Sequence, residues 1–201
     1  MYSKISQYID SLDSDAISQE RKDILQTLIN FIVEKKEKGI TPEINFICTH
    51  NSRRSQLAQI WAQTIAEFYK IPIKAFSGGV EVTAFYKSAI NTIEETGFKI
   101  NKGKNENPKI EVGFAEDVPA IITFSKIFDD DENPKSGFAA VMTCSHADEN
   151  CPFIAGAEKR IPIMYEDPKI FDGTPQAAKK YAERNKQIAT EMKYVFSQIK
   201  K

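Results

Sequence analysis

Residues 46–62 read FICTHNSRRSQLAQIWA and connect a short strand to a helix through a polar loop. The stretch Ile44-Asn45-Phe46-Ile47 predicts the strand, and the loop follows over residues 48–54. The helix is expected over residues 55–69, because apolar side chains recur there at helical spacing. They are Leu57, Ile60, Trp61, Ile65 and Phe68. A strand, a polar loop and a helix in this order are the parts of an anion-binding turn.

Strands and helices also alternate along the rest of the chain. Further strands are expected at residues 72–76, 139–143 and 160–164, and helices at residues 84–96 and from about 174 onward. This order is typical of an α/β fold, in which helical crossovers connect parallel strands. With 201 residues, the chain is long enough to bury a core without metal or disulfide support.

Two regions stand outside this pattern. Residues 1–40 predict an N-terminal helical extension, either a helical pair or one bent helix, which we expect to serve in packing or oligomerisation. The catalytic domain is then expected over residues 41–201. Residues 99–136 form a candidate insertion, in which residues 109–114 and 120–124 are possible strands.

The loop from Cys48 to Arg54 has the composition of an oxyanion site. Five residues separate the two, a length that lets the backbone N–H groups converge on one tetrahedral anion. The following helix adds the positive end of its dipole, and Arg54 can contact two oxyanion oxygens at once. The residues expected to bind the oxyanion are Thr49, His50, Asn51, Ser52, Arg53 and Arg54.

Cys48 is the predicted nucleophile. The positive field of the loop favours the thiolate, which is the form of cysteine that attacks. Ser55 follows the loop and is expected to donate a hydrogen bond to this sulfur. The alternative interpretation is a surface strand–helix turn with an incidental cysteine.

Two more cysteines occur in the stretch VMTCSHADENCP, residues 141–152. Cys144 and Cys151 are too far apart in sequence for a CxxC redox motif or the usual spacing of a structural zinc site. In a helix they would lie about 10 Å apart along the axis, too far for a disulfide, but they can meet if the segment loops out. Two buried, inert cysteines are the alternative.

These stretches together resemble a known family. FICTHNSRRSQLAQIWA resembles the phosphate-binding loop and first helix of the low-molecular-weight protein tyrosine phosphatase fold. VMTCSHADENCP resembles the cysteine segment of the thioredoxin-coupled arsenate reductases, which share that fold. The resemblance covers roughly residues 43–200 and implies a three-layer α/β sandwich with a central, mostly parallel four-stranded sheet.

The resemblance implies a relay of three thiols. Cys48 attacks arsenate, Cys144 attacks Cys48 and expels arsenite, and Cys151 then attacks Cys144. The resulting Cys144–Cys151 disulfide is reduced by thioredoxin. The chain is accordingly expected to be an arsenate reductase of the thioredoxin type.

Asp167 is the expected acid, because the leaving oxygen of the oxyanion must take up a proton. Both related families carry an Asp-Pro step in the corresponding late loop, as Asp167-Pro168 does here. Glu166 and Asp172 are the alternatives for this role.

The chain departs from the family pattern at several positions. His50 stands where the reductases usually have glycine, and Arg53 stands where many have another cysteine. The charge of Arg53 could raise oxyanion affinity or simply point to solvent. Residues 99–136 exceed the family segment, which implies an inserted hairpin over the site. Residues 168–173 lack the paired tyrosines of the tyrosine phosphatases, which disfavours phosphotyrosine as the substrate.

Composition excludes several other functions. The net charge of −1 argues against a nucleic-acid-binding protein, and the absence of a long apolar run argues against a membrane span. The N-terminal residues lack a signal-peptide core, so a cytoplasmic protein is expected. No cofactor and no metal site are expected.

Two other functions remain open. A phosphomonoester hydrolase would need Cys48, Arg54 and Asp167, but neither Cys144 nor Cys151. A non-catalytic module that binds oxyanions or senses redox state is the third possibility, with the N-terminal helices docking a partner.

Overall fold

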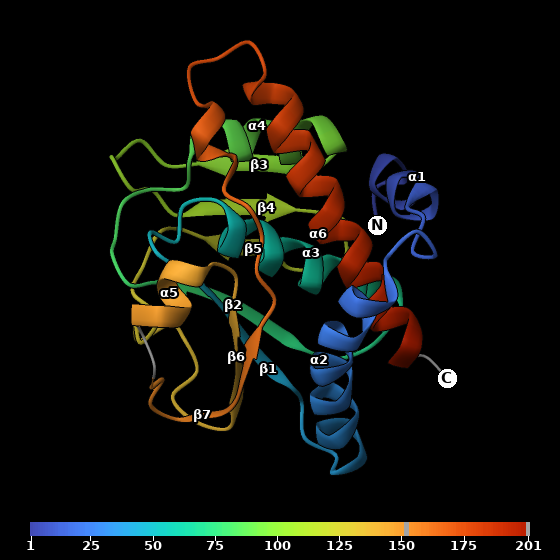
Figure 1. Cartoon of the computed structure of the whole chain (residues 1–201). Coiled ribbons are helices and arrows are strands. Elements are labelled where there is room, and N and C mark those ends of the chain that lie inside the picture. The colour runs from blue at the N-terminus through green and yellow to red at the C-terminus, as the bar shows by residue number, and fades with distance from the viewer. Residues whose placement is uncertain (151–152, 200–201) are drawn as a thin grey trace.

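The computed structural model describes residues 1–150 and 153–199, and Figure 1 shows its architecture. Helices and strands alternate along most of the chain. In order, they are α1 (Ser3–Ser11), α2 (Gln19–Glu37), β1 (Glu43–Cys48), α3 (Arg54–Phe68), β2 (Lys74–Gly79), α4 (Lys87–Thr96), β3 (Lys99–Lys102), β4 (Ile110–Gly113), β5 (Ile121–Thr123), β6 (Phe138–Met142), α5 (Ser145–Asn150), β7 (Ala157–Pro162), the 3-10 helix η1 (Pro168–Phe171) and α6 (Ala177–Ile199).

The central sheet has four strands in the order β2-β1-β6-β7, and every neighbouring pair is parallel. This confirms the predicted α/β fold. β1 lies inside the sheet, with Ile47 opposite Gly78 on one side and Met142 on the other. Since all four strands run the same way, the chain leaves β1 and β6 at the same edge.

Apolar side chains cover both faces of this sheet. Alternate residues of β6 point to opposite faces, as a strand requires. Ala139 and Val141 join the large core under α2, α3 and α6. Phe138, Ala140 and Met142 join a smaller cluster beneath α5. The arrangement is therefore a three-layer sandwich, with a thick helical layer on one face and a thin layer on the other.

The first forty residues form two helices rather than one bent helix. The turn between them ends at Ser18, whose side chain caps α2 by accepting from the Arg21 N–H. α2 packs along α6, as Figure 1 shows. The large core is continuous from Ile5 and Ile9 of α1 to Ile199 of α6. The division into an extension and a catalytic domain stays a prediction.

The insertion forms a three-stranded antiparallel sheet in the order β3-β4-β5, not the expected two-stranded hairpin. The additional strand is β3, a polar edge strand whose sequence KINK offered one apolar residue as a signal. Ile110, Val112 and Ile121 point into the large core beside α3.

No helix within residues 1–150 and 153–199 combines the length and the apolar character required to cross a bilayer.

Candidate active site

Asn51 sets the shape of the loop between β1 and α3. Its φ is +46°, a left-handed conformation that asparagine adopts more readily than most residues. Its Oδ1 accepts from the Lys126 N–H at 3.0 Å and from Gln56 Nε2 at 3.2 Å. Its Nδ2 donates to Ser55 Oγ at 2.8 Å. Because Asn51 is completely buried, these bonds hold the loop in one conformation.

Ser55 Oγ lies 3.1 Å from Cys48 Sγ, and both side chains are buried. The oxygen already accepts a hydrogen from Asn51 Nδ2, so its own hydrogen is available to the sulfur. A hydroxyl at this position can donate a hydrogen bond to the nucleophilic sulfur. The geometry is consistent with the role that the sequence predicts for Ser55.

The backbone of the loop leaves its donors available. The N–H groups of residues 50–54 have no acceptor among the described residues. Helix α3 starts at Arg54 with no side-chain cap and no acidic residue in its first turn, so its positive end is uncompensated. Free amides at the start of a helix suit a bound oxyanion.

Arg54 joins the loop to the late acidic segment. Its Nη1 donates to the Tyr165 carbonyl oxygen at 3.0 Å, and its Nη2 lies 2.5 Å from Asp167 Oδ2. Its Nε is buried with no hydrogen-bond partner among residues 1–150 and 153–199. The other oxygen of Asp167 accepts from the Lys169 N–H at 3.0 Å. The guanidinium therefore binds the Asp167 carboxylate and keeps one donor, Nε, without a partner among these residues.

The three candidate acids have different surroundings. Glu166 is exposed and pairs with Arg184 at 3.0 Å. Asp172 pairs with Arg53 at 2.8 Å. Of the three, only Asp167 contacts the guanidinium at the end of the loop. The structure thus favours Asp167 for the acid, although its role in catalysis stays a prediction.

Gly79, at the end of β2, allows the loop to pack closely against the sheet. A Cβ at this position would lie 2.7 Å from the Asn51 nitrogen and 2.8 Å from the Thr49 oxygen. Both are backbone atoms, which cannot rotate away. A side chain here would displace the loop.

The segment after β5 supports the loop from behind instead of covering it. Ser125 Oγ donates to the His50 carbonyl oxygen at 2.8 Å and accepts from the Thr83 N–H at 2.9 Å. The Lys126 N–H bonds to Asn51. The inserted sheet therefore helps to fix the loop, a role that sequence reasoning missed.

Cys144 follows β6, the strand next to β1. Ile47 lies opposite Met142, and the Thr143 N–H donates to the Ile47 oxygen at 2.7 Å. Neighbouring strands are about 4.8 Å apart. Cys48 and Cys144 therefore leave adjacent strands at the same edge of the sheet. Both are buried free thiols in the smaller apolar cluster.

Thr49 connects the loop to this second thiol. Its Oγ1 lies 3.5 Å from Cys144 Sγ and 3.3 Å from His146 Nδ1. The Ala147 N–H in α5 donates to the same sulfur at 3.4 Å. Cys151, the third cysteine, lies outside the described residues. The structure thus places two of the three predicted thiols at one site.

Comparisons with known proteins agree with this geometry. No protein-family model matches the chain. It is 29% identical to an arsenate reductase of Staphylococcus aureus (strain Newman) over 126 residues, which are 62% of this chain and 77% of that protein. A low molecular weight protein tyrosine phosphatase from T. tengcongensis matches with a TM-score of 0.56 at 15% identity, covering 79% of this chain and 99% of the other. The chain has the low-molecular-weight phosphatase fold, and arsenate reductases are among its sequence relatives.

The same fold also occurs in an arsenate reductase solved in a phosphate-binding state. That structure matches with a TM-score of 0.50 at 17% identity and covers 79% of this chain and 99% of the other. The low-molecular-weight phosphatase fold is thus shared by hydrolases and reductases, and both groups are enzymes. The fold alone cannot decide between them, so the decision rests on the residues of the site.

Arg53 is largely buried, so it does not point to solvent. Its Nε donates to the Tyr181 hydroxyl at 2.6 Å, and its guanidinium lies 4.0 Å from the centre of the Tyr86 ring. Burial raises the pKa of Tyr181, so its hydroxyl stays protonated. This hydroxyl donates a hydrogen bond to Asp172 Oδ1 at 2.8 Å. These contacts anchor the loop to α6. A contribution of the Arg53 charge to oxyanion affinity stays a prediction.

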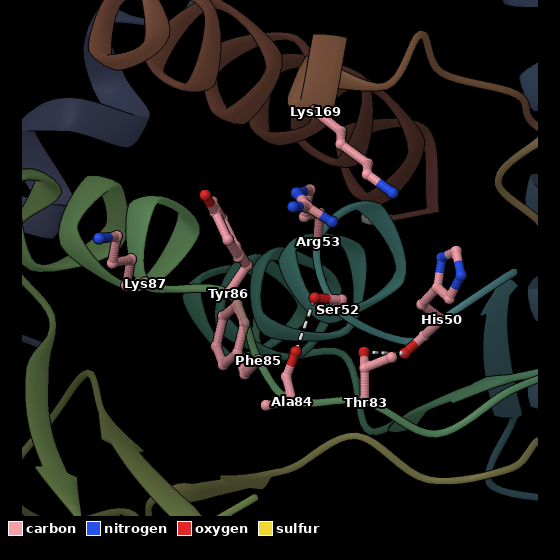
Figure 2. Close-up of a pocket in the computed structure, with 9 residues that line it drawn as sticks. All are labelled: His50, Ser52, Arg53, Thr83, Ala84, Phe85, Tyr86, Lys87 and Lys169. Carbon is pink, nitrogen blue, oxygen red and sulfur yellow. Dashed lines mark hydrogen bonds between the residues drawn. The ribbon is translucent and has the colours of Figure 1, made fainter. Parts of the chain in front are cut away.

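A cavity of about 500 Å³ opens beside the loop, and Figure 2 shows the residues around it. His50 and Lys169 both lie at its rim, and Lys169 extends toward the loop in this view. Phe85 and Tyr86 supply aromatic surface. The imidazole of His50 lies 3.3 Å from Glu81. This cavity is larger than an inorganic oxyanion requires.

Lys126 is a buried amine that no pattern in the sequence predicted. Its side chain lies over the Phe124 ring, 4.6 Å from the ring centre. Burial lowers the pKa of Lys126 to about 8.

Within the part of the chain that the structure describes, no group of three or more His, Cys, Asp or Glu side chains is arranged to hold a metal ion.

Proposed function

We propose that this protein reduces arsenate to arsenite, with Cys48 as nucleophile and Cys144 and Cys151 as successive resolving thiols. The observation that supports this most strongly is the buried Cys144 thiol at the end of β6, in contact with Thr49 of the oxyanion loop. Hydrolysis through Cys48 would need no second thiol there. The sequence relation to a protein named arsenate reductase points the same way.

In the first step, arsenate binds to the free amides of residues 50–54 and to Arg54. It displaces the Asp167 carboxylate from the guanidinium. The Cys48 thiolate then attacks arsenic, forming a sulfur–arsenic bond while one arsenic–oxygen bond breaks. The freed Asp167 carboxylate takes up a proton from solvent and passes it to that oxygen, which leaves as water.

In the second step, the Cys144 thiolate attacks the Cys48 sulfur. A disulfide forms, and the electron pair of the sulfur–arsenic bond stays on arsenic. Arsenic is thereby reduced from the +5 to the +3 state and leaves as arsenite. The two sulfur atoms supply the two electrons. The Ala147 N–H and Thr49 Oγ1 lie within hydrogen-bond reach of the attacking sulfur.

In the third step, the Cys151 thiolate attacks Cys144 and releases the Cys48 thiolate for another turnover. An external dithiol protein reduces the Cys144–Cys151 disulfide, and we propose thioredoxin for this role. Such a cycle suits the cytoplasm, where the thioredoxin and glutathione systems keep thiols reduced.

A phosphomonoester hydrolase is the second candidate, and the cavity beside the loop favours it. Its volume of about 500 Å³ lies in the range of small-molecule sites. Phe85 and Tyr86 could contact an aromatic group attached to the phosphate. This activity would use Cys48 with Arg54 and Asp167, and water would resolve the phosphoenzyme.

The two candidates are separated by measuring two activities on the same variants. Arsenite release is followed with thioredoxin, thioredoxin reductase and NADPH, and hydrolysis is followed with an aryl phosphate. We expect Cys144→Ser to abolish arsenite turnover and to retain any hydrolysis, whereas Cys48→Ser abolishes both. A wild-type protein that hydrolyses the ester but releases no arsenite would refute the reductase proposal.

A further inference from the structure

Arg21, near the start of α2, forms a two-pronged ion pair with α6. Its Nε lies 2.9 Å from Glu191 Oε1, and its Nη2 lies 2.8 Å from Oε2. The Glu191 side chain is only 3% exposed, so hydrogen bonds from neighbouring donors must replace those that its carboxylate would form with water. Gln187 supplies one more, at 3.0 Å. A bidentate pair of this kind fixes direction as well as distance.

The same guanidinium holds the chain segment that leads to the acid. Arg21 Nη2 also donates to the Met164 carbonyl oxygen at 3.1 Å. Its guanidinium carbon lies 5.1 Å from the centre of the Tyr165 ring. Burial raises the pKa of Tyr165 well above its usual value, so the ring stays neutral and its face attracts the cation. Arg21 thus contacts two consecutive residues of this segment.

That segment lies next to the oxyanion loop. The Tyr165 oxygen accepts from Arg54 Nη1 at 3.0 Å, and Asp167 pairs with Nη2 of the same guanidinium. A continuous set of contacts therefore runs from Arg21 through Tyr165 to Arg54 and Asp167. α2 lies outside the catalytic domain that the sequence predicts, yet it supports the segment that carries the acid.

We propose that Arg21 is a positioning residue for Asp167, so that one side chain of α2 holds the segment that carries the acid. The effect on the chemical step rests on the function proposed above, whereas the contacts do not. Misplacing a catalytic group by about 1 Å costs on the order of 100-fold in rate. We therefore expect Arg21→Ala to lower the turnover number by about 10- to 100-fold.

The kinetic test compares Arg21→Ala with Lys36→Ala. Lys36 lies on the same helix and donates to the Ile199 oxygen of α6, but it has no contact with the acid segment. We expect Arg21→Ala to reduce the turnover number for arsenite release, with KM changed less than about threefold and Lys36→Ala near wild type. An equal loss in both variants would mean that α2 acts only as a general brace and would overturn the proposal.

A double-mutant cycle with Asp167→Asn tests whether the effect passes through the acid. If Arg21 acts by positioning Asp167, then Arg21→Ala should change turnover by less than about threefold once the acid is gone. A loss as large as in the wild-type background would overturn the proposal. Should Arg21→Ala fail to fold because Glu191 is left unpaired, the pair Arg21→Met with Glu191→Leu removes both charges and takes its place.

Hydrogen exchange gives a readout that does not depend on activity. The Tyr165 N–H bonds to the Thr143 oxygen at 3.1 Å, so its exchange reports whether the acid segment is held in place. We expect faster exchange over residues 163–167 in Arg21→Ala, with exchange in α3 unchanged. If the wild type releases no arsenite, the proposed function fails while this measurement still tests Arg21. Unchanged exchange over residues 163–167 would overturn the inference alone.

Discussion

Nη2 of Arg54 lies 2.5 Å from Oδ2 of Asp167, so the protein's own carboxylate occupies the guanidinium that an oxyanion needs. Both side chains are at least partly buried, with 11% and 28% of their surfaces exposed, which limits screening by water. Substrate and acid must therefore compete for Arg54. Displacement by the substrate would leave the Asp167 carboxylate free to take up the proton that the leaving oxygen requires.

Replacing Asp167 by asparagine should tighten oxyanion binding while it slows catalysis. Removal of the competing charge should lower the dissociation constant of inorganic phosphate by about tenfold, the value of a modest charge-assisted hydrogen bond. Turnover should fall because the leaving oxygen loses its acid. Calorimetric titration checks this, with Glu166→Gln as control because Glu166 pairs with Arg184 instead. Unchanged or weaker binding in Asp167→Asn would show that the pair does not restrict the site.

Ser55→Ala should make Cys48 less reactive. The hydroxyl lies 3.1 Å from the sulfur and can donate a hydrogen bond to it, so its loss should slow alkylation of Cys48 by about tenfold, equivalent to about 1.4 kcal/mol. Peptide mass spectrometry separates Cys48 from the other thiols. Ser52→Ala is the matched control, since the Ser52 hydroxyl donates to the Ala84 oxygen at 2.6 Å. Equal slowing in both variants would indicate a loosened loop and not a lost hydrogen bond.

Gly79→Ala should displace the backbone of the oxyanion loop without replacing any side chain of the loop. The new Cβ would clash with backbone atoms of Asn51 and Thr49, so we expect the affinity for phosphate to fall and the protein to lose about 1–3 kcal/mol of stability. Gly113→Ala is the control, because a Cβ there meets nothing nearer than 3.6 Å. Urea titration measures stability. Normal phosphate affinity in Gly79→Ala would show that the loop tolerates the shift.

Lys126 should make stability depend on pH. Burial lowers its pKa to about 8 from 10.5, so the unfolded chain binds more protons than the folded protein between these values. Its contribution to the free energy of unfolding therefore rises with pH across this window. Lys126→Met should stabilise the protein below pH 8, by at most about 3.4 kcal/mol at 1.36 kcal/mol per pKa unit, and the gain should fade toward pH 10.5.

The control for this prediction is Lys109→Met. Lys109 lies over the same Phe124 ring, at 5.2 Å from its centre, but its side chain is 61% exposed. Its replacement should give no comparable gain at neutral pH. A gain for Lys126→Met that does not change between pH 7 and pH 10 would contradict the assignment to a buried charge.

Local sequence patterns predicted most of the fold. Short, mostly apolar stretches predicted β1 and β6, because the strands inside the sheet are buried. The apolar stripe from Leu57 to Phe68 predicted α3 by its helical spacing. The pattern failed for β3, whose polar sequence forms an edge strand only because β4 is available to pair with it. The helix α5 between the two cysteines was one of two possibilities, and the sequence alone did not choose.

The candidate site was predictable where its residues are neighbours in sequence. Cys48, Arg54 and Ser55 lie on one strand–loop–helix unit, so local spacing was enough to bring them together. Contacts between distant segments left no such signal. Nothing near Arg53 indicates that Tyr181 will accept from it, and nothing near Lys126 indicates that it will support Asn51. These pairings depend on how the helices and the inserted sheet pack.

The most direct measurement of the three-thiol relay is a single turnover without any added reductant. The fully reduced protein is mixed with excess arsenate, arsenite is quantified, and the disulfide is located by peptide mass spectrometry. We predict one arsenite per protein molecule, one disulfide between Cys144 and Cys151, and a free Cys48 thiol. In Cys151→Ser, the disulfide should be trapped between Cys48 and Cys144. Three free thiols after exposure to arsenate, with no arsenite released, would contradict the account.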